Sequence, residues 1–207
     1  MVTEQGLPVA ACQQRAEIDT ALCFHSPKLS LGNAWRAPLA ATALVLPPSS
    51  MLALCKVTDS LFISNSRSAC NENLLAQEKI SLCINVSRQQ PFPSSQKIQT
   101  LRVPVFDDPS EDLHRYFESC SDAIEGTVQS GGKCLVYCKN GRSRSAALCI
   151  AYLMRYQNLS LKDAFEIVKM ARPVIDPNPG FWSQLQKYEE HLKRKHLGDP
   201  SQKGTSQ

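Results

Sequence analysis

Histidines and paired cysteines are scarce in this chain of 207 residues. It has only four histidines, and none of its nine cysteines stands in a Cys-x-x-Cys pair. Structural zinc sites are usually built from such pairs or from closely spaced histidines, so we expect no metal and no cofactor. The number of cysteines is odd and the sequence shows no clear secretory signal, and both observations argue against a disulfide framework. We therefore expect a reducing compartment in which the cysteines stay free.

Charge of one sign is not strongly in excess either. The chain has 23 Lys and Arg against 19 Asp and Glu, a formal net charge of +4. This mild balance suits phosphorylated or acidic partners, but it is too small to indicate nucleic-acid binding. No long basic tract with interleaved aromatic residues occurs in the sequence. We expect no nucleic acid among the partners of this protein.

Long hydrophobic runs are also missing. The apolar stretch at residues 37–47 falls well short of the ~18–20 residues that a membrane span needs, so we expect no membrane partner. Hydrophobic residues make up 43% and charged residues 20% of the chain, as in ordinary soluble proteins. The length allows one domain with a substantial core. We expect a monomer in the cytoplasm, with the nucleus as a second location.

The sequence divides into three parts by its patterning. Residues 1–50 mix polar and apolar residues without a sustained period, which predicts a flexible N-terminal extension, with a docking or targeting segment as the alternative. Residues 51–195 carry regular strand and helix patterns and are expected to form one folded domain. Residues 196–207 are expected to be a disordered tail.

Strand patterns come first in the domain, and helix patterns follow. Short apolar runs predict a hairpin of two strands at residues 57–65 and single strands at residues 80–86, 101–106 and 134–137. Helical spacing and end signals predict helices at residues 71–79, from Ser110 to Gln129, at 146–154, from Ser160 to Pro173 and at 179–195. This order predicts an α/β fold, with a central mixed sheet of about five strands flanked by helices.

The most informative segment of the chain reads CLVYCKNGRSRSAA. An apolar strand pattern ends at Cys138, a short polar loop follows, and Arg144 stands six positions after the cysteine, where a helix pattern begins. A loop between a strand and a helix N-terminus directs backbone N–H groups and the helix dipole at one point, which suits an anion. Cysteines in such surroundings ionise more readily than free thiols. The segment predicts nucleophilic attack of a thiolate on a phosphate ester.

The residues from Cys138 to Ser145 have expected roles. Cys138 is the candidate nucleophile, and Arg144 is expected to grip two phosphoryl oxygens. Ser145 is expected to donate a hydrogen bond to the Cys138 sulfur. This bond would ease departure of the sulfur from the cysteinyl-phosphate intermediate that such an attack forms. The expected substrate-binding residues are Lys139, Asn140, Gly141, Arg142, Ser143 and Arg144. Gly141 allows a tight turn, and the Arg142 side chain is expected at the rim, where it either attracts an acidic substrate or crowds the entrance.

These residues resemble the Cys-x5-Arg signature loop of the cysteine-dependent phosphatases. The segments LRVPVFDDPSEDL and ARPVIDPNPGFWSQLQKYEE resemble the dual-specificity branch of that superfamily, in its atypical class. The resemblance covers roughly residues 51–195. It implies a small dual-specificity phosphatase domain that hydrolyses phosphotyrosine and phosphoserine or phosphothreonine in phosphorylated proteins, through a cysteinyl-phosphate and without a metal.

The leaving oxygen of such a reaction needs a proton from a general acid. Asp107 and Asp108 follow the strand expected at residues 101–106, and parallel strands bring their C-terminal loops to one edge of the sheet. Alignment on Leu113 places Asp107 where the family has its acid, and Asp108 remains the alternative. The resemblance also gives Asn178 a position near the last helix, where we expect it to brace a loop.

One departure from the family pattern concerns the strength of catalysis. The family normally has a histidine before its cysteine, whereas this chain has Tyr137. A phenol is neutral at pH 7, so we expect a less acidic thiol and weaker catalysis. The alternative function is accordingly a low-activity pseudophosphatase that binds phosphate and acts as a phospho-protein trap or scaffold. A phosphatase for RNA 5′ ends or phosphoinositides is a third possibility.

Overall fold

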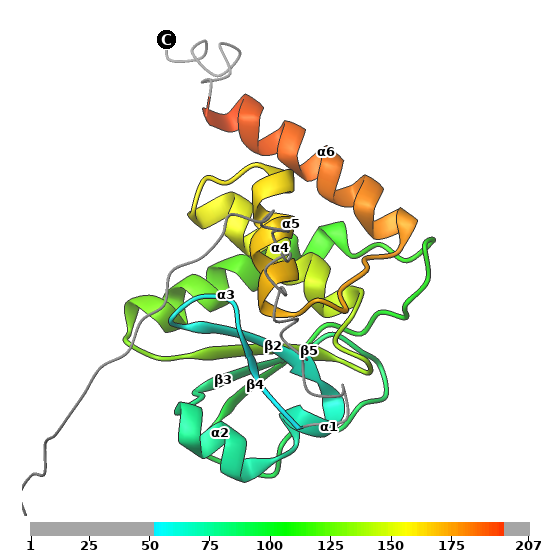
Figure 1. Ribbon diagram of the computed structural model, residues 1–207. Coiled ribbons are helices and arrows are strands. Elements are labelled where there is room, and N and C mark those ends of the chain that lie inside the picture. The colour runs from blue at the N-terminus through cyan, green and yellow to red at the C-terminus, as the bar shows by residue number, and fades with distance from the viewer. Residues whose placement is uncertain (1–51, 197–207) are drawn as a thin grey trace, which may run out of the picture. The chain divides into compact units, whose positions relative to one another are not determined.

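A mixed five-stranded sheet forms the centre of the computed structural model, which describes residues 52–196 (Figure 1). Its strand order is β1-β2-β5-β3-β4, with β1 antiparallel to β2 and all other neighbours parallel. The strands are β1 (Cys55–Lys56), β2 (Leu61–Asn65), β3 (Leu82–Asn85), β4 (Gln99–Arg102) and β5 (Cys134–Cys138). The predicted α/β fold is confirmed. The expected extension at residues 1–50 and the expected tail at residues 196–207 lie outside the described residues, apart from His196, which ends the last helix.

Helices cover both faces of the sheet. They are α1 (Ser66–Ala69), α2 (Glu72–Glu78), α3 (Phe117–Gln129), α4 (Arg144–Tyr156), α5 (Leu161–Ala171) and α6 (Pro179–His196). Figure 1 shows α1 and α2 on one face and α3 to α6 on the other. Within the described residues, no helix is both long and apolar enough to cross a membrane.

The central strand β5 divides its side chains between two cores. Every residue of β5 is buried, because parallel neighbours flank it and helices cover both of its faces. Successive side chains of a strand point to opposite faces. Val136 and Cys138 therefore join the core under α3 to α6, whereas Leu135 and Tyr137 join the smaller core under α1 and α2. The two neighbours Tyr137 and Cys138 thus face opposite sides of the sheet.

The helices mostly begin where the sequence predicts. Ser160 caps α5, and its hydroxyl accepts the backbone N–H of Asp163 at 3.1 Å. The predicted helix at residues 71–79 is α2, where the Asn71 side chain accepts the N–H of Leu74. Helix α4 is buried from Arg144 to Met154, as its almost continuous apolar sequence indicates.

Three expected boundaries were wrong. The predicted hairpin at residues 57–65 has its first strand earlier, at β1, because Thr58 accepts the N–H groups of Ser60 and Leu61 and closes a turn there. The predicted strand at residues 101–106 is β4, which ends at Arg102, before Pro104, since proline has no N–H for a ladder.

The third correction concerns Ser110, which does not cap a helix. Its N–H and hydroxyl both donate to Asp108 Oδ1, at 2.8 and 2.6 Å, so that it closes a turn. The segment then runs through a short 3-10 helix, His114–Tyr116, before α3 begins at Phe117. This longer loop, residues 103–113, carries both candidate acids and is called the acid loop below.

Candidate active site

The candidate nucleophile lies at the C-terminal end of the central strand. Cys138 is the last residue of β5 and is 1% exposed. Its Sγ lies 3.2 Å from the hydroxyl oxygen of Ser145, the second residue of α4. The thiol therefore sits at the N-terminal end of a helix, where the free N–H groups and the helix dipole favour a negative charge.

The loop from Cys138 to Arg144 is tightly curved. Gly141 has φ of +63°, and an added Cβ would lie 2.8 Å from the backbone nitrogen of Asn65. Both the backbone angle and the contact with the end of β2 exclude larger residues at this position. Gly141 and Ser143 are buried, whereas the side chains of Lys139, Asn140 and Arg142 are exposed at the rim.

Arg172, a residue that our sequence analysis did not assign, holds this loop from outside. Its Nε donates to the carbonyl of Gly141 at 2.6 Å, and its Nη2 donates to the carbonyl of Asn140 at 3.0 Å. The carbonyl of Lys139 accepts from the N–H and hydroxyl of Ser66. Because peptide groups are planar and trans, the N–H that follows each carbonyl points to the opposite side of the loop. Arg172 thus helps to turn N–H groups toward the anion site.

Arg144 is a buried cation with a free donor. The residue is 7% exposed, and its Nη1 donates to the carbonyl of Val105 at 3.2 Å. Its Nε lies 3.8 Å from Asp107 Oδ2 and has no hydrogen-bond partner among the described residues. A buried donor without a partner is unfavourable, so this guanidinium is well prepared to bind an anion.

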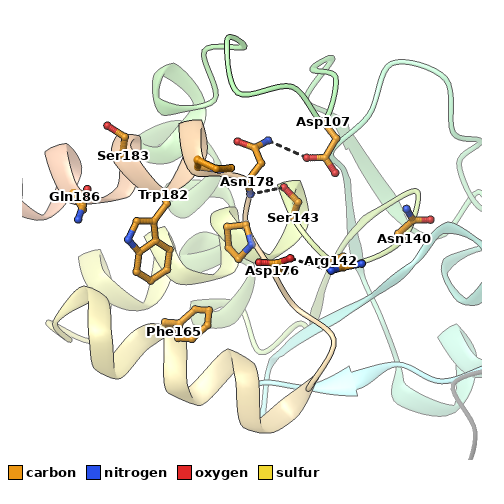
Figure 2. Close-up of a pocket in the computed structure, with 12 residues that line it drawn as sticks. Asp107, Asn140, Arg142, Ser143, Phe165, Asp176, Asn178, Trp182, Ser183 and Gln186 are labelled. Carbon is orange, nitrogen blue, oxygen red and sulfur yellow. Dashed lines mark hydrogen bonds and ion pairs between the residues drawn. The ribbon is translucent and has the colours of Figure 1, made fainter.

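The two candidate acids have different surroundings. Asp107 Oδ1 accepts a hydrogen bond from Asn178 Nδ2 at 3.0 Å (Figure 2). Its other carboxylate oxygen, Oδ2, lies 3.8 Å from Arg144 Nε. Asp108 instead binds Ser110, and those hydrogen bonds lower the pKa of the Asp108 carboxyl. A general acid must carry a proton, so the geometry and the lowered pKa of Asp108 both favour Asp107.

Helix α6 fixes the acid loop in place. Asn178 bridges Asp107, Ser143 and the start of α6: its N–H donates to Ser143 Oγ at 3.1 Å, and its Oδ1 accepts the N–H of Phe181 at 3.0 Å. This is the loop brace expected at this position. Gln184 accepts the N–H groups of Leu113 and His114 and donates to the carbonyl of Glu111, distances of 2.8 to 2.9 Å.

The rim of the site is partly neutral. Arg142 Nη2 lies 2.9 Å from Asp176 Oδ2, and the carbonyl of Arg142 accepts the N–H of Asp176 at 2.8 Å. The Arg142 side chain is therefore at the rim, as expected. Its charge is offset by Asp176, which weakens any attraction for acidic substrates.

Tyr137 makes no contact with the signature loop through its hydroxyl. The hydroxyl donates to the carbonyl of Pro91 at 2.7 Å, on the side of α1 and α2. Burial raises the pKa of the Tyr137 phenol, so the group stays neutral at pH 7. Asn85 donates to the same carbonyl at 3.2 Å. Tyr137 thus ties the loop after β3 to the sheet.

Comparisons with known proteins identify the family. The model of the family described as dual specificity phosphatase, catalytic domain, matches residues 61–191. The chain belongs to this family and is a protein-tyrosine/serine/threonine phosphatase, as the sequence motifs predicted.

Within the family, the similar relatives include atypical members. Dual specificity phosphatase 28 of Homo sapiens is 55% identical over 79% of this chain and 90% of its own length. Dual specificity protein phosphatase 18 of Mus musculus is 43% identical over 75% of this chain and 83% of its own length.

Solved structures agree with this placement. The crystal structure of human DUSP28 is 58% identical, with a TM-score of 0.67, and the match covers 72% of this chain and 97% of that one. A mouse putative dual specificity phosphatase complexed with zinc tungstate is 52% identical, with a TM-score of 0.69, over 75% of this chain and 98% of that one.

Proposed function

We propose that the protein dephosphorylates phosphotyrosine and phosphoserine or phosphothreonine in other proteins through a phosphocysteine on Cys138. The thiolate attacks phosphorus, forming the S–P bond as the bond to the substrate oxygen breaks. The Asp107 carboxyl gives its proton to that leaving oxygen. Arg144 and the loop N–H groups hold the phosphoryl oxygens throughout.

The second step releases inorganic phosphate. A water molecule attacks phosphorus in the intermediate and gives its proton to the Asp107 carboxylate, while the S–P bond breaks. The electron pair returns to Cys138 as a thiolate, which a hydrogen bond from Ser145 stabilises. Acid and thiolate are then restored for the next turnover.

One observation carries this proposal. The thiol of Cys138, 3.2 Å from Ser145, lies at the start of the same helix as the buried Arg144, whose Nε has no partner among the described residues. The mouse relative solved with zinc tungstate, a salt of a tetrahedral oxyanion, supports a phosphate-binding role for the corresponding fold.

The test is hydrolysis of a small aryl phosphate without added metal. We expect Cys138→Ser to have no measurable turnover. Asp107→Asn should lower kcat by about 10²- to 10⁴-fold, the usual contribution of a positioned general acid. Asp108→Asn is the matched control and should stay near wild type. Turnover that survives in Cys138→Ser contradicts the mechanism, and a loss confined to Asp108→Asn would reassign the acid.

A phospho-protein trap is the second candidate function. The neutral Tyr137 and the exposed rim side chains of Lys139, Asn140 and Arg142 favour slow turnover. A wild-type protein that binds phosphopeptides but does not hydrolyse the aryl phosphate would establish this role. We also propose a monomer that resides in the cytoplasm and nucleus, which light scattering and cell fractionation would test.

A further inference from the structure

A groove leads away from the proposed phosphate site along α6. It has a volume of about 810 Å³, within the range of ~300–1,000 Å³ typical of ligand sites. One end is formed by Asp107, Ser143 and Asn178 of the active site, and the other by Phe165 of α5 and Trp182 of α6 (Figure 2). A phosphorylated residue bound at Arg144 therefore places its neighbouring residues at the entrance of this groove.

The far end of the groove is apolar. The rings of Phe165 and Trp182 meet edge to face, with centroids 5.2 Å apart and planes at 88°, and both residues are partly buried. Pro177 and Pro179 add further apolar surface, and the exposed Ser183 and Gln186 form the polar margin. Edge-to-face contact favours a defined ring orientation, so this surface is in place before a ligand binds.

The groove has little uncompensated charge. Asp176 is paired with Arg142 at 2.9 Å. Asp107, the remaining carboxyl group of the lining, faces Arg144, with 3.8 Å between its Oδ2 and Arg144 Nε. An apolar side chain therefore gains more from this surface than a charged one, which would lose hydration without gaining a partner.

We propose that the groove binds a large aliphatic or aromatic side chain close to the phosphorylated residue of the substrate protein. The proposal rests on the function proposed above and makes Trp182 and Phe165 determinants of substrate choice. It follows from the continuity of the groove with the phosphate site and from the apolar, charge-balanced lining.

The experiment uses phosphotyrosine peptides that differ at one position between −3 and +3. Leu, Phe, Ser, Asp or Arg is placed there, and kcat/KM is divided by that for a small aryl phosphate. At one position we expect this relative kcat/KM to be about tenfold higher for Leu or Phe than for Ser and Asp, a usual effect of one apolar pocket contact. In Trp182→Ala this preference should fall to about twofold or less.

Controls separate folding from recognition. Trp182→Phe keeps an aromatic ring and should retain most of the preference. Met170→Ala replaces a side chain that is 82% exposed and lies outside the groove lining, so its preference should equal that of wild type. If Trp182→Ala does not fold, Phe165→Ala removes the partner ring instead.

Failure of this inference is distinguishable from failure of the proposed function. Hydrolysis of the aryl phosphate without any preference among peptides would overturn the groove assignment alone, as would a preference for Arg or one that persists in Trp182→Ala. If nothing is hydrolysed, the same peptides are bound to the Cys138→Ser variant. The Kd of the Ser or Asp peptide divided by that of the Leu or Phe peptide then measures the preference without turnover. Equal Kd values would also reject the proposal.

Discussion

Tyr137 and Cys138 are adjacent in β5 but belong to different cores. The phenol donates to the Pro91 carbonyl beneath α1 and α2, whereas the thiol faces α4. Any effect of residue 137 on the thiol must therefore pass through the charge of the side chain or the shape of the backbone, because the two side chains do not point toward each other.

Replacing Tyr137 by histidine tests the first of these routes. A histidine is partly protonated at pH 6, and a nearby cation favours a thiolate. We expect Tyr137→His to speed alkylation of the protein by iodoacetamide at pH 6 by about two- to tenfold, through Cys138. Tyr137→Phe keeps a neutral ring and should match wild type. Equal alkylation rates for the His and Phe variants would show that the charge of residue 137 does not matter.

Residues that act within one segment could be predicted from their spacing, and the resemblance supplied Asp107 and Asn178, whereas the role of Arg172 could not be predicted. Cys138, Gly141, Arg144 and Ser145 share one strand–loop–helix segment, so their spacing alone indicates an anion site. Arg172 binds the carbonyls of residues 140 and 141 from the far end of α5. The residues next to Arg172 in the sequence do not indicate this contact, because the contact depends on how α5 packs.

At the scale of elements, the junction between α6 and the acid loop is the most restrictive contact of the site. A Cβ added at Gly180 would lie 2.5 Å from Cα and 2.6 Å from the carbonyl carbon of Pro109. These are backbone atoms, so a larger residue at Gly180 must displace the acid loop, and with it Asp107.

The substitution Gly180→Ala should impair the general acid without changing the reactivity of the nucleophile. We expect kcat for an aryl phosphate to fall by about 10- to 100-fold, the effect of a displacement of about 1 Å. Alkylation of Cys138 should stay near the wild-type rate. Gly126→Ala in α3 is the matched control, because an added Cβ there meets nothing within 4 Å. A kcat equal to that of Gly126→Ala would contradict a rigid junction.

Elements with self-contained patterns were predicted more accurately than the loop that carries the acid. The apolar run of β5 and the nearly continuous apolar sequence of α4 define those elements without reference to the rest of the chain. Ser110 has the residue type of a helix cap, but Asp108 takes its donors and Gln184 takes the N–H groups of Leu113 and His114. The competing acceptors became visible only with the tertiary structure.

At the scale of the whole molecule, the core contains many neutral acids. Burial raises the pKa of Cys83 and Cys120 to about 12. It also raises the pKa values of Cys134, Cys149 and Tyr137. In the unfolded chain these thiols ionise near pH 8.5 and the phenol near pH 10.

Stability should therefore fall in mild alkali. Above about pH 8.5 the unfolded chain binds fewer protons than the folded protein, so the free energy of unfolding decreases by up to about 1.4 kcal/mol per pH unit for each such group. The decrease continues until the pH reaches the folded-state pKa. We expect the urea midpoint under reducing conditions to drop steeply between pH 8 and 10, and less steeply in Cys120→Ala. An unchanged midpoint would contradict this prediction.

The anchoring of Asp107 through Asn178 and α6 bears on how two kinds of ester can share one site. In a phosphoserine and in a phosphotyrosine, the leaving oxygen is one bond away from phosphorus. An acid held at a constant distance from the phosphorus therefore meets that oxygen in the same place, whether an aliphatic or an aromatic carbon lies behind it. Selection between the two esters then depends on the depth and width of the entrance, and a stationary proton donor is sufficient for both.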